Sequence, residues 1–291
     1  MGLPLNARHA MLGSVSGRHR SPIRGSALEF AQYRKYVPGD DTRRLDWRTW
    51  GRTDRYYIKE FEADTNLRLC FIIDTSGSMA YGEEGKTRLD YAKSIVGTLA
   101  YLASQQGDAV GLYAGSKNDT DTPFTREIPP KRGPRHLGVM LDQIALLEAS
   151  GETGLVEAIH QAAEKIAQRA LIVIVSDLLF DVTPLQEAFQ HLKFRKHDIV
   201  AFHLLDREEI EFDFDRPTRF LDLEGGPSLL ADPALIRRRY QDAVKEYLDQ
   251  VNQIASQSVI DYHRTYLDES YEQALARFLV GRNPKTARSA R

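Results

Sequence analysis

The chain has 291 residues, 42% of them hydrophobic and 27% charged, which are ordinary values for a folded globular protein. Its net charge of −2 gives no global attraction for nucleic acid or for an anionic membrane. The N-terminus lacks the basic-then-apolar pattern of a signal peptide, and no apolar stretch approaches the roughly 18 residues of a membrane span. We therefore expect a soluble, cytoplasmic protein that does not bind nucleic acid and has no transmembrane segment.

Residues 1–66 form a basic and aromatic N-terminal arm with no sustained helical or strand period. Residues 1–59 carry twelve Arg and Lys against five Asp and Glu, so the rest of the chain is acidic. Two interpretations stay open: a structural arm whose Arg43 and Arg44 pair with nearby Asp residues, or a basic surface that faces a partner. In either case we expect the aromatic side chains to pack the arm against the body; they are Trp47, Trp50, Tyr56 and Tyr57.

From about residue 67 strands and helices alternate. Apolar runs predict strands over 67–74, 108–114, 169–177 and 197–206. Residues 125–130 and 218–225 are expected to be edge strands, the former because its prolines would interrupt a central ladder. Helical periodicity covers 87–107, 133–148, 153–169, 182–194 with Thr183 as cap, a long helix from Asp232, and 269–281.

Strands separated by helices of this length need crossover connections, which predicts a mainly parallel α/β sheet with helices on both faces. We expect this domain to cover 67–282, followed by a polar tail at 283–291. Cys70, the single cysteine, lies inside an apolar run, so we expect an inert core residue rather than a reactive thiol. Asp74 and Asp177 both end predicted strands, which places two carboxylates at one edge of the sheet, where such sheets bind ligands.

The stretch FIIDTSGSM at 71–79 allows several chemistries. A serine nucleophile is disfavoured because the Gly-x-Ser-x-Gly elbow is absent and the histidines lie within predicted helices or strands. A phosphate loop is disfavoured because GEEGKT at 82–87 has its glycines three apart rather than five. A phosphohydrolase with Asp74 as nucleophile is the enzymatic alternative, since an Asp that ends the first strand is typical of haloacid-dehalogenase-like phosphatases. Those enzymes need a general acid two positions later, and Ser76 stands there.

A metal site accounts for the residue types. Asp74, Ser76 and Ser78 are oxygen donors at alternate positions, and Gly77 permits a tight turn between them. Thr153 and Asp177 are candidates to add a hydroxyl and a carboxylate from two other loops. Such a donor set suits Mg²⁺, with Mn²⁺ or Ca²⁺ as alternatives, and suits zinc poorly. Two carboxylates and three neutral hydroxyls would leave the ion able to attract a carboxylate from another protein.

At these residues the chain resembles a von Willebrand factor A (vWA) domain with a metal-ion-dependent adhesion site (MIDAS). The resemblance covers about residues 67–280 and implies a Rossmann-like fold. It also implies that the serines and the threonine bind the ion directly and the aspartates often through water. One departure stands in the third loop, where Leu178 replaces the glycine of the common Thr/Ser-Asp-Gly form.

The arm resembles the signature of the bacterial "domain of unknown function 58" (DUF58) family, with its Glu-Phe, Arg-x-Tyr, Pro-Gly-Asp-Asp and Asp-Trp elements. Members often occur with MoxR-type AAA+ ATPases. The resemblance thus implies a non-enzymatic adaptor or co-chaperone in protein maturation or remodelling. Its metal would bind an acidic residue of the ATPase or of the ATPase's substrate. A degenerate site on a domain that serves only as a scaffold is a third interpretation.

Overall fold

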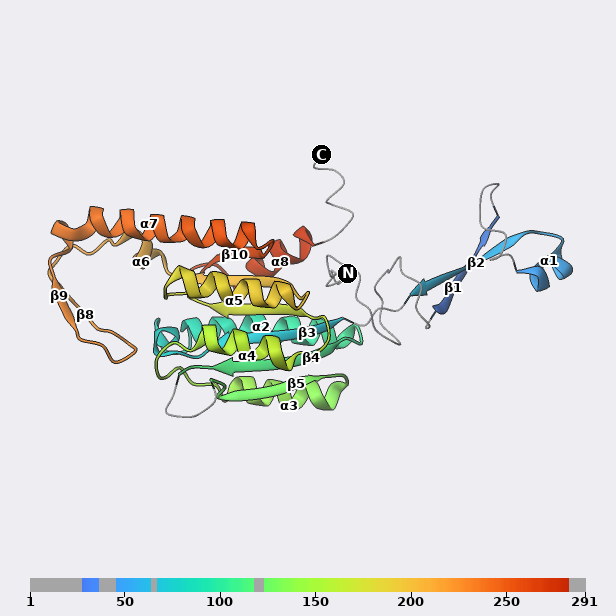
Figure 1. Cartoon of the computed structure of the whole chain (residues 1–291), viewed down its shortest axis with the longest axis horizontal. Helices are drawn as coiled ribbons and strands as arrows, with labels where there is room; N and C mark the ends of the chain where they lie inside the picture. Colours follow the sequence, from blue (N-terminus) through green and yellow to red (C-terminus); the bar gives the residue numbers. More distant parts are fainter. Residues whose placement is uncertain (1–27, 37–45, 64–66, 118–122, 283–291) are drawn as a thin grey trace. The chain divides into compact units, whose positions relative to one another are not determined.

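The computed structural model describes residues 28–36, 46–63, 67–117 and 123–282 (Figure 1). The chain divides into two compact units, one within His9–Leu67 and the other from Arg68 onward, and each is described by itself. The boundaries of the arm at 1–66 and the vWA domain at 67–282 stay predictions, and the tail at 283–291 lies outside the described residues. No helix among the described residues has both the length and the apolar character needed to cross a membrane.

The arm contains regular structure that its sequence period did not reveal. Strand β1 (Leu28–Lys35) pairs antiparallel with β2 (Tyr57–Ala63), and helix α1 (Trp47–Thr53) lies between them in the chain. Asp46 begins this helix: its carboxylate accepts hydrogen bonds from the backbone N–H of Thr49, at 3.3 Å, and from the Thr49 hydroxyl, at 3.0 Å. The Asp of the Asp-Trp signature therefore has a structural role.

The aromatic residues of the arm contact one another. Trp50 stacks on Tyr56 with ring centroids 5.9 Å apart, and Trp47 meets Trp50 edge-on at 6.2 Å. That these rings pack the arm against the body stays a prediction. The Pro-Gly-Asp-Asp element and the two arginines after it lie outside the described residues.

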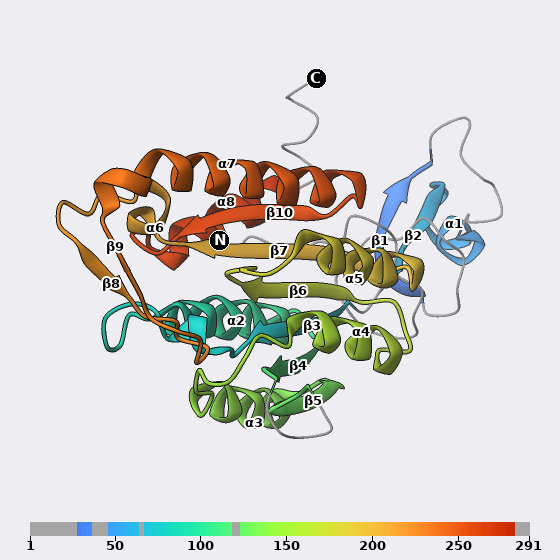
Figure 2. The same ribbon diagram turned by 60° about the vertical axis from the view of Figure 1, so that its left-hand side comes forward.

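A six-stranded sheet forms the centre of the second unit (Figure 2). Its order is β10-β7-β6-β3-β4-β5, and every neighbouring pair is parallel except β4 and β5. This confirms the mainly parallel sheet with an antiparallel edge strand. The strands are β3 (Arg68–Asp74), β4 (Ala109–Gly115), β5 (Arg126–Lys131), β6 (Leu171–Ser176), β7 (Asp198–Leu205) and β10 (Asp261–Tyr266).

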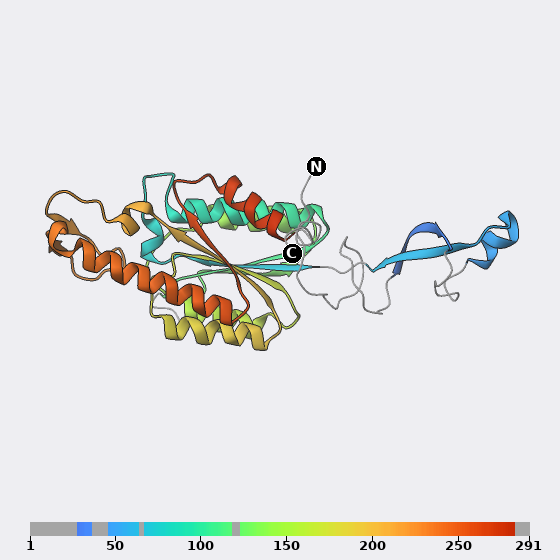
Figure 3. The ribbon, with the colours of Figure 1, turned by 90° about the horizontal axis from the view of Figure 1, so that it is seen from above.

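Helices cover both faces of this sheet, as predicted (Figure 3). On one face α2 (Arg88–Gln105) lies between α3 (Pro134–Ala145) and α8 (Tyr271–Gly281). On the other face α5 (Val182–Phe194) lies between α4 (Leu155–Lys165) and α7 (Pro233–Gln257). The short helix α6 (Arg207–Glu211) follows β7. The four inner strands are buried over almost their whole length, which is why their sequences read as continuous apolar runs.

Cys70 is fully buried in the core beneath α4 and α5, among residues such as Ile159 and Phe189. Burial raises the pKa of its thiol to about 12, which suppresses the reactive thiolate. The prediction of an inert core cysteine is confirmed.

One predicted edge strand and one predicted helix cap were wrong, and the edge strand β10 was missed. Residues 218–225 do not form an edge strand of the main sheet: β8 (Thr218–Phe220) pairs only with β9 (Leu229–Ala231), in a separate two-stranded hairpin. The edge position is taken by β10, whose side chains are mostly half-buried and whose sequence, DYHRTY, lacks an apolar run. Helix α5 begins at Val182 after Asp181, one residue before the expected cap Thr183.

The chain reverses direction across the sheet at β3. After β3 it adds β4 and β5 on one side, and it then crosses to β6 on the other side. Strands β3 and β6 are therefore neighbours, with Ile73 opposite Val175. Ligands of doubly wound sheets bind at the carboxyl ends of strands at such a switch point. Asp74 and Asp177 lie at that point.

Candidate metal centre

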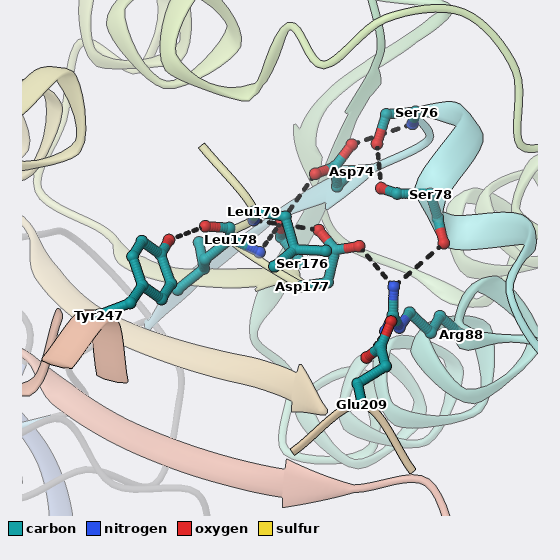
Figure 4. Close-up of polar contacts among 10 residues, drawn as sticks. All are labelled: Asp74, Ser76, Ser78, Arg88, Ser176, Asp177, Leu178, Leu179, Glu209 and Tyr247. Atoms are coloured by element: carbon teal, nitrogen blue, oxygen red, sulfur yellow. Dashed lines mark hydrogen bonds and ion pairs between the residues drawn. The ribbon is translucent and has the colours of Figure 1, made fainter. Parts of the chain in front are cut away.

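Asp74 is the centre of the candidate site, at the buried end of β3 (Figure 4). One carboxylate oxygen accepts a hydrogen bond from the backbone N–H of Ser76 at 2.9 Å. The other accepts from the Ser176 hydroxyl at 2.7 Å, and this bond joins the ends of β3 and β6. Each oxygen keeps a second lone pair, so the carboxylate can still face a cation or a water bound to one.

The two serine hydroxyls of the first loop converge. Ser76 precedes a short 3-10 helix, Gly77–Ala80, in which Ser78 is the second residue. The tight turn brings the Ser76 and Ser78 hydroxyl oxygens to 3.1 Å from each other. Two hydroxyl oxygens this close, beside the Asp74 carboxylate, match the adjacent donors expected of the Asp-x-Ser-x-Ser spacing.

The second loop is fastened to the first by its backbone. The Ser150 N–H donates to the Thr75 carbonyl at 2.8 Å, and the Gly77 N–H donates to the Gly151 carbonyl at 2.9 Å. These bonds set the loop that carries Thr153 against the Asp-x-Ser-x-Ser turn. The Thr153 hydroxyl is buried and has no hydrogen-bond partner among the described residues. A buried polar atom without a partner destabilises the fold, so binding of a ligand to this oxygen would be favourable.

The third loop keeps a glycine-like shape without a glycine. Leu178 has φ +52°, a left-handed conformation that costs a non-glycine residue roughly 1–2 kcal/mol. Its side chain is fully buried in the core, which contributes about 1.5–3 kcal/mol. Burial of the side chain is thus of the same order as the strain and offsets it. The Leu178 carbonyl also accepts a hydrogen bond from the Tyr247 hydroxyl of α7. The Leu178 departure therefore leaves the Asp177 carboxylate at the site.

Arg88, the first residue of α2, is an unforeseen member of the site. Its guanidinium is 1% exposed and donates to Asp177 at 2.8 Å and to the carbonyl of Ser78 at 3.3 Å. It also forms an ion pair with Glu209 of α6. A backbone N–H from Leu179 reaches the other Asp177 oxygen at 3.4 Å. One oxygen of the Asp177 carboxylate is therefore held by Arg88 of α2, and the other by the backbone of its own loop.

The charges at the site do not balance. Burial, and then the neighbouring Asp177 carboxylate, raise the pKa of Asp74 to about 6, although hydrogen bonds from Ser176 and Ser76 lower it. Burial also raises the pKa of Glu209, against the nearby Arg88 charge that lowers it. Three acidic side chains, those of Asp74, Asp177 and Glu209, thus lie around the single guanidinium of Arg88. A divalent cation would offset this excess of acidic groups.

The side chains present fit a hard divalent cation. Among the described residues, no group of three or more His, Cys, Asp or Glu could hold a metal, so any site here depends on hydroxyl oxygens. Hydrogen bonds join Asp74 to Ser76 and Ser76 to Ser78, while Thr153 joins the set through the backbone of its loop. An ion held here would supply a positive charge at the sheet edge, attractive to carboxylates.

The sequence missed three members of this site. Ser176 could have been found, because it stands directly before Asp177 at the same strand end. Arg88 and Glu209 gave no signal, since charged residues at helix starts are normally exposed.

The topology defines the class of the second unit. A mainly parallel sheet in the order β5-β4-β3-β6-β7-β10, with β5 antiparallel and helices on both faces, is the Rossmann-like vWA type of α/β fold. A crystal structure of a conserved hypothetical protein, BatB from Bacteroides thetaiotaomicron, shares the fold: its TM-score is 0.50 at 16% identity, over 74% of this chain and 98% of that one. The vWA domain of SpRpn10 aligns at a TM-score of 0.42 and 15% identity, over 76% of this chain and 96% of that one.

The family described as "Protein of unknown function DUF58" matches residues 32–249, and the chain belongs to this family. A relative, the uncharacterized protein Rv1480 of Mycobacterium tuberculosis, is 28% identical over 241 residues, which cover 80% of this chain and 73% of that protein. The resemblance predicted from the arm and from the first loop is thereby confirmed at the level of family and fold.

Proposed function

We propose that the chain is a metal-dependent protein-interaction module. Its vWA domain binds Mg²⁺ and, through the ion, an acidic residue of a partner protein. Five side chains from three loops hold the ion: Asp74, Ser76, Ser78, Thr153 and Asp177. The vWA fold supports an interaction module in general terms; the ion and its ligands are our proposal.

The observation that carries the proposal is the buried Thr153 hydroxyl without a partner, on a loop fastened to the turn around Asp74. A metal ion supplies the missing contact. Because hydroxyl ligands are neutral, the ion keeps most of its charge and attracts a further carboxylate.

We further propose that the partner is a MoxR-type AAA+ ATPase or one of its substrates, with this chain as adaptor in protein maturation or remodelling. This finer proposal rests on the family resemblance of the arm. The basic composition of residues 1–59 would let the arm contact an acidic surface of such a partner.

A phosphohydrolase that uses Asp74 is the rival function. Ser76, the residue two positions after Asp74, offers the site a hydroxyl and a backbone N–H instead of the general acid that such chemistry needs. Saturable turnover of phosphate esters with Mg²⁺, lost on Asp74→Asn, would favour the rival.

Calorimetric titration of Mg²⁺ and Mn²⁺ tests the metal site. Ser78 is half-buried and its hydroxyl contacts only Ser76 in the described structure, so Ser78→Ala removes a donor with little structural cost. We expect Ser78→Ala to weaken metal binding by about tenfold or more. The exposed Ser256 of α7 gives the matched control, Ser256→Ala, which should bind as the wild type does.

The same pair of variants tests partner capture. Tagged wild-type chain and Ser256→Ala should co-purify with the ATPase in Mg²⁺ and lose it in EDTA, whereas Ser78→Ala should retain little in either buffer. Metal binding that is equal in all three proteins would contradict the proposed ligands. Capture that is unchanged by EDTA would contradict metal-dependent binding.

A further inference from the structure

The hairpin of β8 and β9 reaches back over the candidate metal centre. The hairpin lies between α6 and α7 in the chain and extends toward the carboxyl edge of β3, so that its connecting loop, residues 221–228, forms the tip (Figure 2). Because the hairpin pairs only with itself, the main sheet does not fix its position. The reason for its contact with the site lies in the residues at its tip.

Gly77 of the Asp-x-Ser-x-Ser turn lies directly against this tip. A Cβ atom added to Gly77 would come within 2.1 Å of the Leu223 carbonyl oxygen, a distance that no side chain permits. The glycine therefore does more than allow a turn: it lets the backbone of a second segment touch the loop that carries the serine hydroxyls.

Glu224 is the residue that the tip delivers to the site. Its carboxylate accepts a hydrogen bond from the backbone N–H of Thr153 at 3.0 Å. Thr153 also carries the buried hydroxyl that lacks a hydrogen-bond partner among the described residues. An acidic side chain of this chain thus lies at the Thr153 loop, close to where the acidic residue of a partner would bind.

The tip is shaped to present this carboxylate. The Glu224 N–H donates to the Asp222 carboxylate at 2.8 Å, an Asx turn that orders the loop. Gly225 follows with φ +93°, a conformation that glycine adopts without strain. Asp222 and Gly225 therefore hold Glu224 at the point where the hairpin meets the site.

The base of the hairpin is anchored by Phe220, whose ring stacks on Phe212 with centroids 5.5 Å apart. The part beyond it is only lightly anchored, because its apolar side chains are largely exposed, and little apolar burial opposes movement of the tip; these side chains are Leu221, Leu223, Leu229 and Leu230. Glu224 itself is half-buried. A contact made by one carboxylate and one carbonyl can be replaced by a competitor that offers equivalent groups.

We propose that Glu224 is an internal ligand of the metal centre: its carboxylate occupies the position of the partner's acid until a partner displaces the hairpin tip. This inference rests on the proposed function and assigns it a regulation. An acidic residue of a partner must compete with Glu224, so the affinity of this chain for carboxylates is set by the hairpin as well as by the ion.

The test compares Glu224→Gln with Glu152→Gln. Both substitutions remove one negative charge. Glu152 precedes Thr153 in the chain, but its exposed carboxylate pairs with Lys117 at 3.5 Å. The probe is Mn²⁺, followed by calorimetry and by water-proton relaxation. We expect Glu224→Gln to bind Mn²⁺ about tenfold more weakly and to raise the relaxivity of the bound ion as water replaces the carboxylate. Acetate should then lower that relaxivity in Glu224→Gln more than in the wild type.

Hydrogen exchange of residues 221–228 gives a second measurement. We expect Mn²⁺ to slow exchange there in the wild type and in Glu152→Gln but not in Glu224→Gln. Equal affinity, relaxivity and exchange in the three proteins would overturn the internal ligand while leaving the proposed metal site standing. A wild-type chain that does not bind Mn²⁺ would overturn both.

Discussion

At the scale of single residues, Arg88 decides how the site behaves without an ion. It is 1% exposed and pairs with two carboxylates, those of Asp177 and Glu209. Removing one partner of a buried ion pair is costly because the remaining charge stays buried. Arg88 therefore stabilises the fold and at the same time stands beside a candidate metal ligand.

We expect Arg88→Met to lower the free energy of unfolding by about 3–5 kcal/mol in EDTA. Mg²⁺ should restore part of this loss, since a cation would neutralise Asp177. Urea denaturation with and without Mg²⁺ measures both effects.

Arg207→Met is the control for that experiment. Arg207 is the first residue of α6, the helix that carries Glu209, and its exposed ion pair with Asp268 should contribute little to stability. If the urea midpoint of Arg88→Met matched that of the wild type, the buried pair would have no role in stability.

The residues that the sequence predicted and those that it missed differ in a physical way. Asp74 and Asp177 could be predicted because an apolar run that ends in an acid is a local pattern. Arg88, Glu209 and Glu224 could not be, because their significance comes from contacts between residues far apart in the chain. A charged residue at a helix start or in a glycine loop reads as an ordinary surface residue.

At the scale of elements, the N-terminal cap of α2 fixes where this helix begins and therefore holds its first residue, Arg88, in place. Thr87 and Asp90 form a reciprocal capping box, with the Asp90 N–H donating to the Thr87 hydroxyl at 3.1 Å and the Thr87 N–H donating to the Asp90 carboxylate at 3.0 Å. Fraying of this first turn would loosen the guanidinium between its two acids.

We expect Thr87→Ala to lower the free energy of unfolding by about 1 kcal/mol, and Thr87→Ser, which keeps the hydroxyl, to recover most of it. Thermal denaturation of the three proteins provides the comparison. Equal losses in Thr87→Ala and Thr87→Ser would show that the methyl group, and not the cap, matters.

The elements that the sequence predicted well are the buried ones. Strands β3, β4, β6 and β7 are apolar on both faces and were recognisable as runs. The edge strand β10 was missed because only one of its six residues is buried, so selection for an apolar pattern is weak. The residues of β8 were predicted as an edge strand since nothing local distinguishes a hairpin outside the sheet from a strand at its margin.

At the scale of the whole molecule, His197 links stability to pH. It lies just before β7 and its ring nitrogen Nδ1 accepts a hydrogen bond from the Ala170 N–H at 3.1 Å. Burial, and then the charges of Arg195 and Arg169, lower its pKa to about 4; Asp198 opposes this, and His191 adds a small lowering effect. As the pH falls below about 6.5, the histidine therefore becomes protonated in the unfolded chain while it stays neutral in the folded chain.

This stabilisation is fully present above about pH 6.5 and is lost as the pH falls toward 4. We expect the wild type to lose on the order of 2 kcal/mol more stability than His197→Asn between pH 7.5 and pH 4.5. The Asn side chain keeps a hydrogen-bond acceptor but does not titrate. Urea denaturation across this range measures the difference, and parallel pH profiles for the two proteins would contradict the assignment.

The segment from the hairpin to α7 is attached to the same site at two points. Glu224 reaches it through Thr153, and Tyr247, further along the same chain, reaches it through the carbonyl of Leu178. In mechanical terms this is a closed linkage, in which the position of one attachment limits the movements open to the other. Release of the tip would break the first of these attachments and leave the second in place.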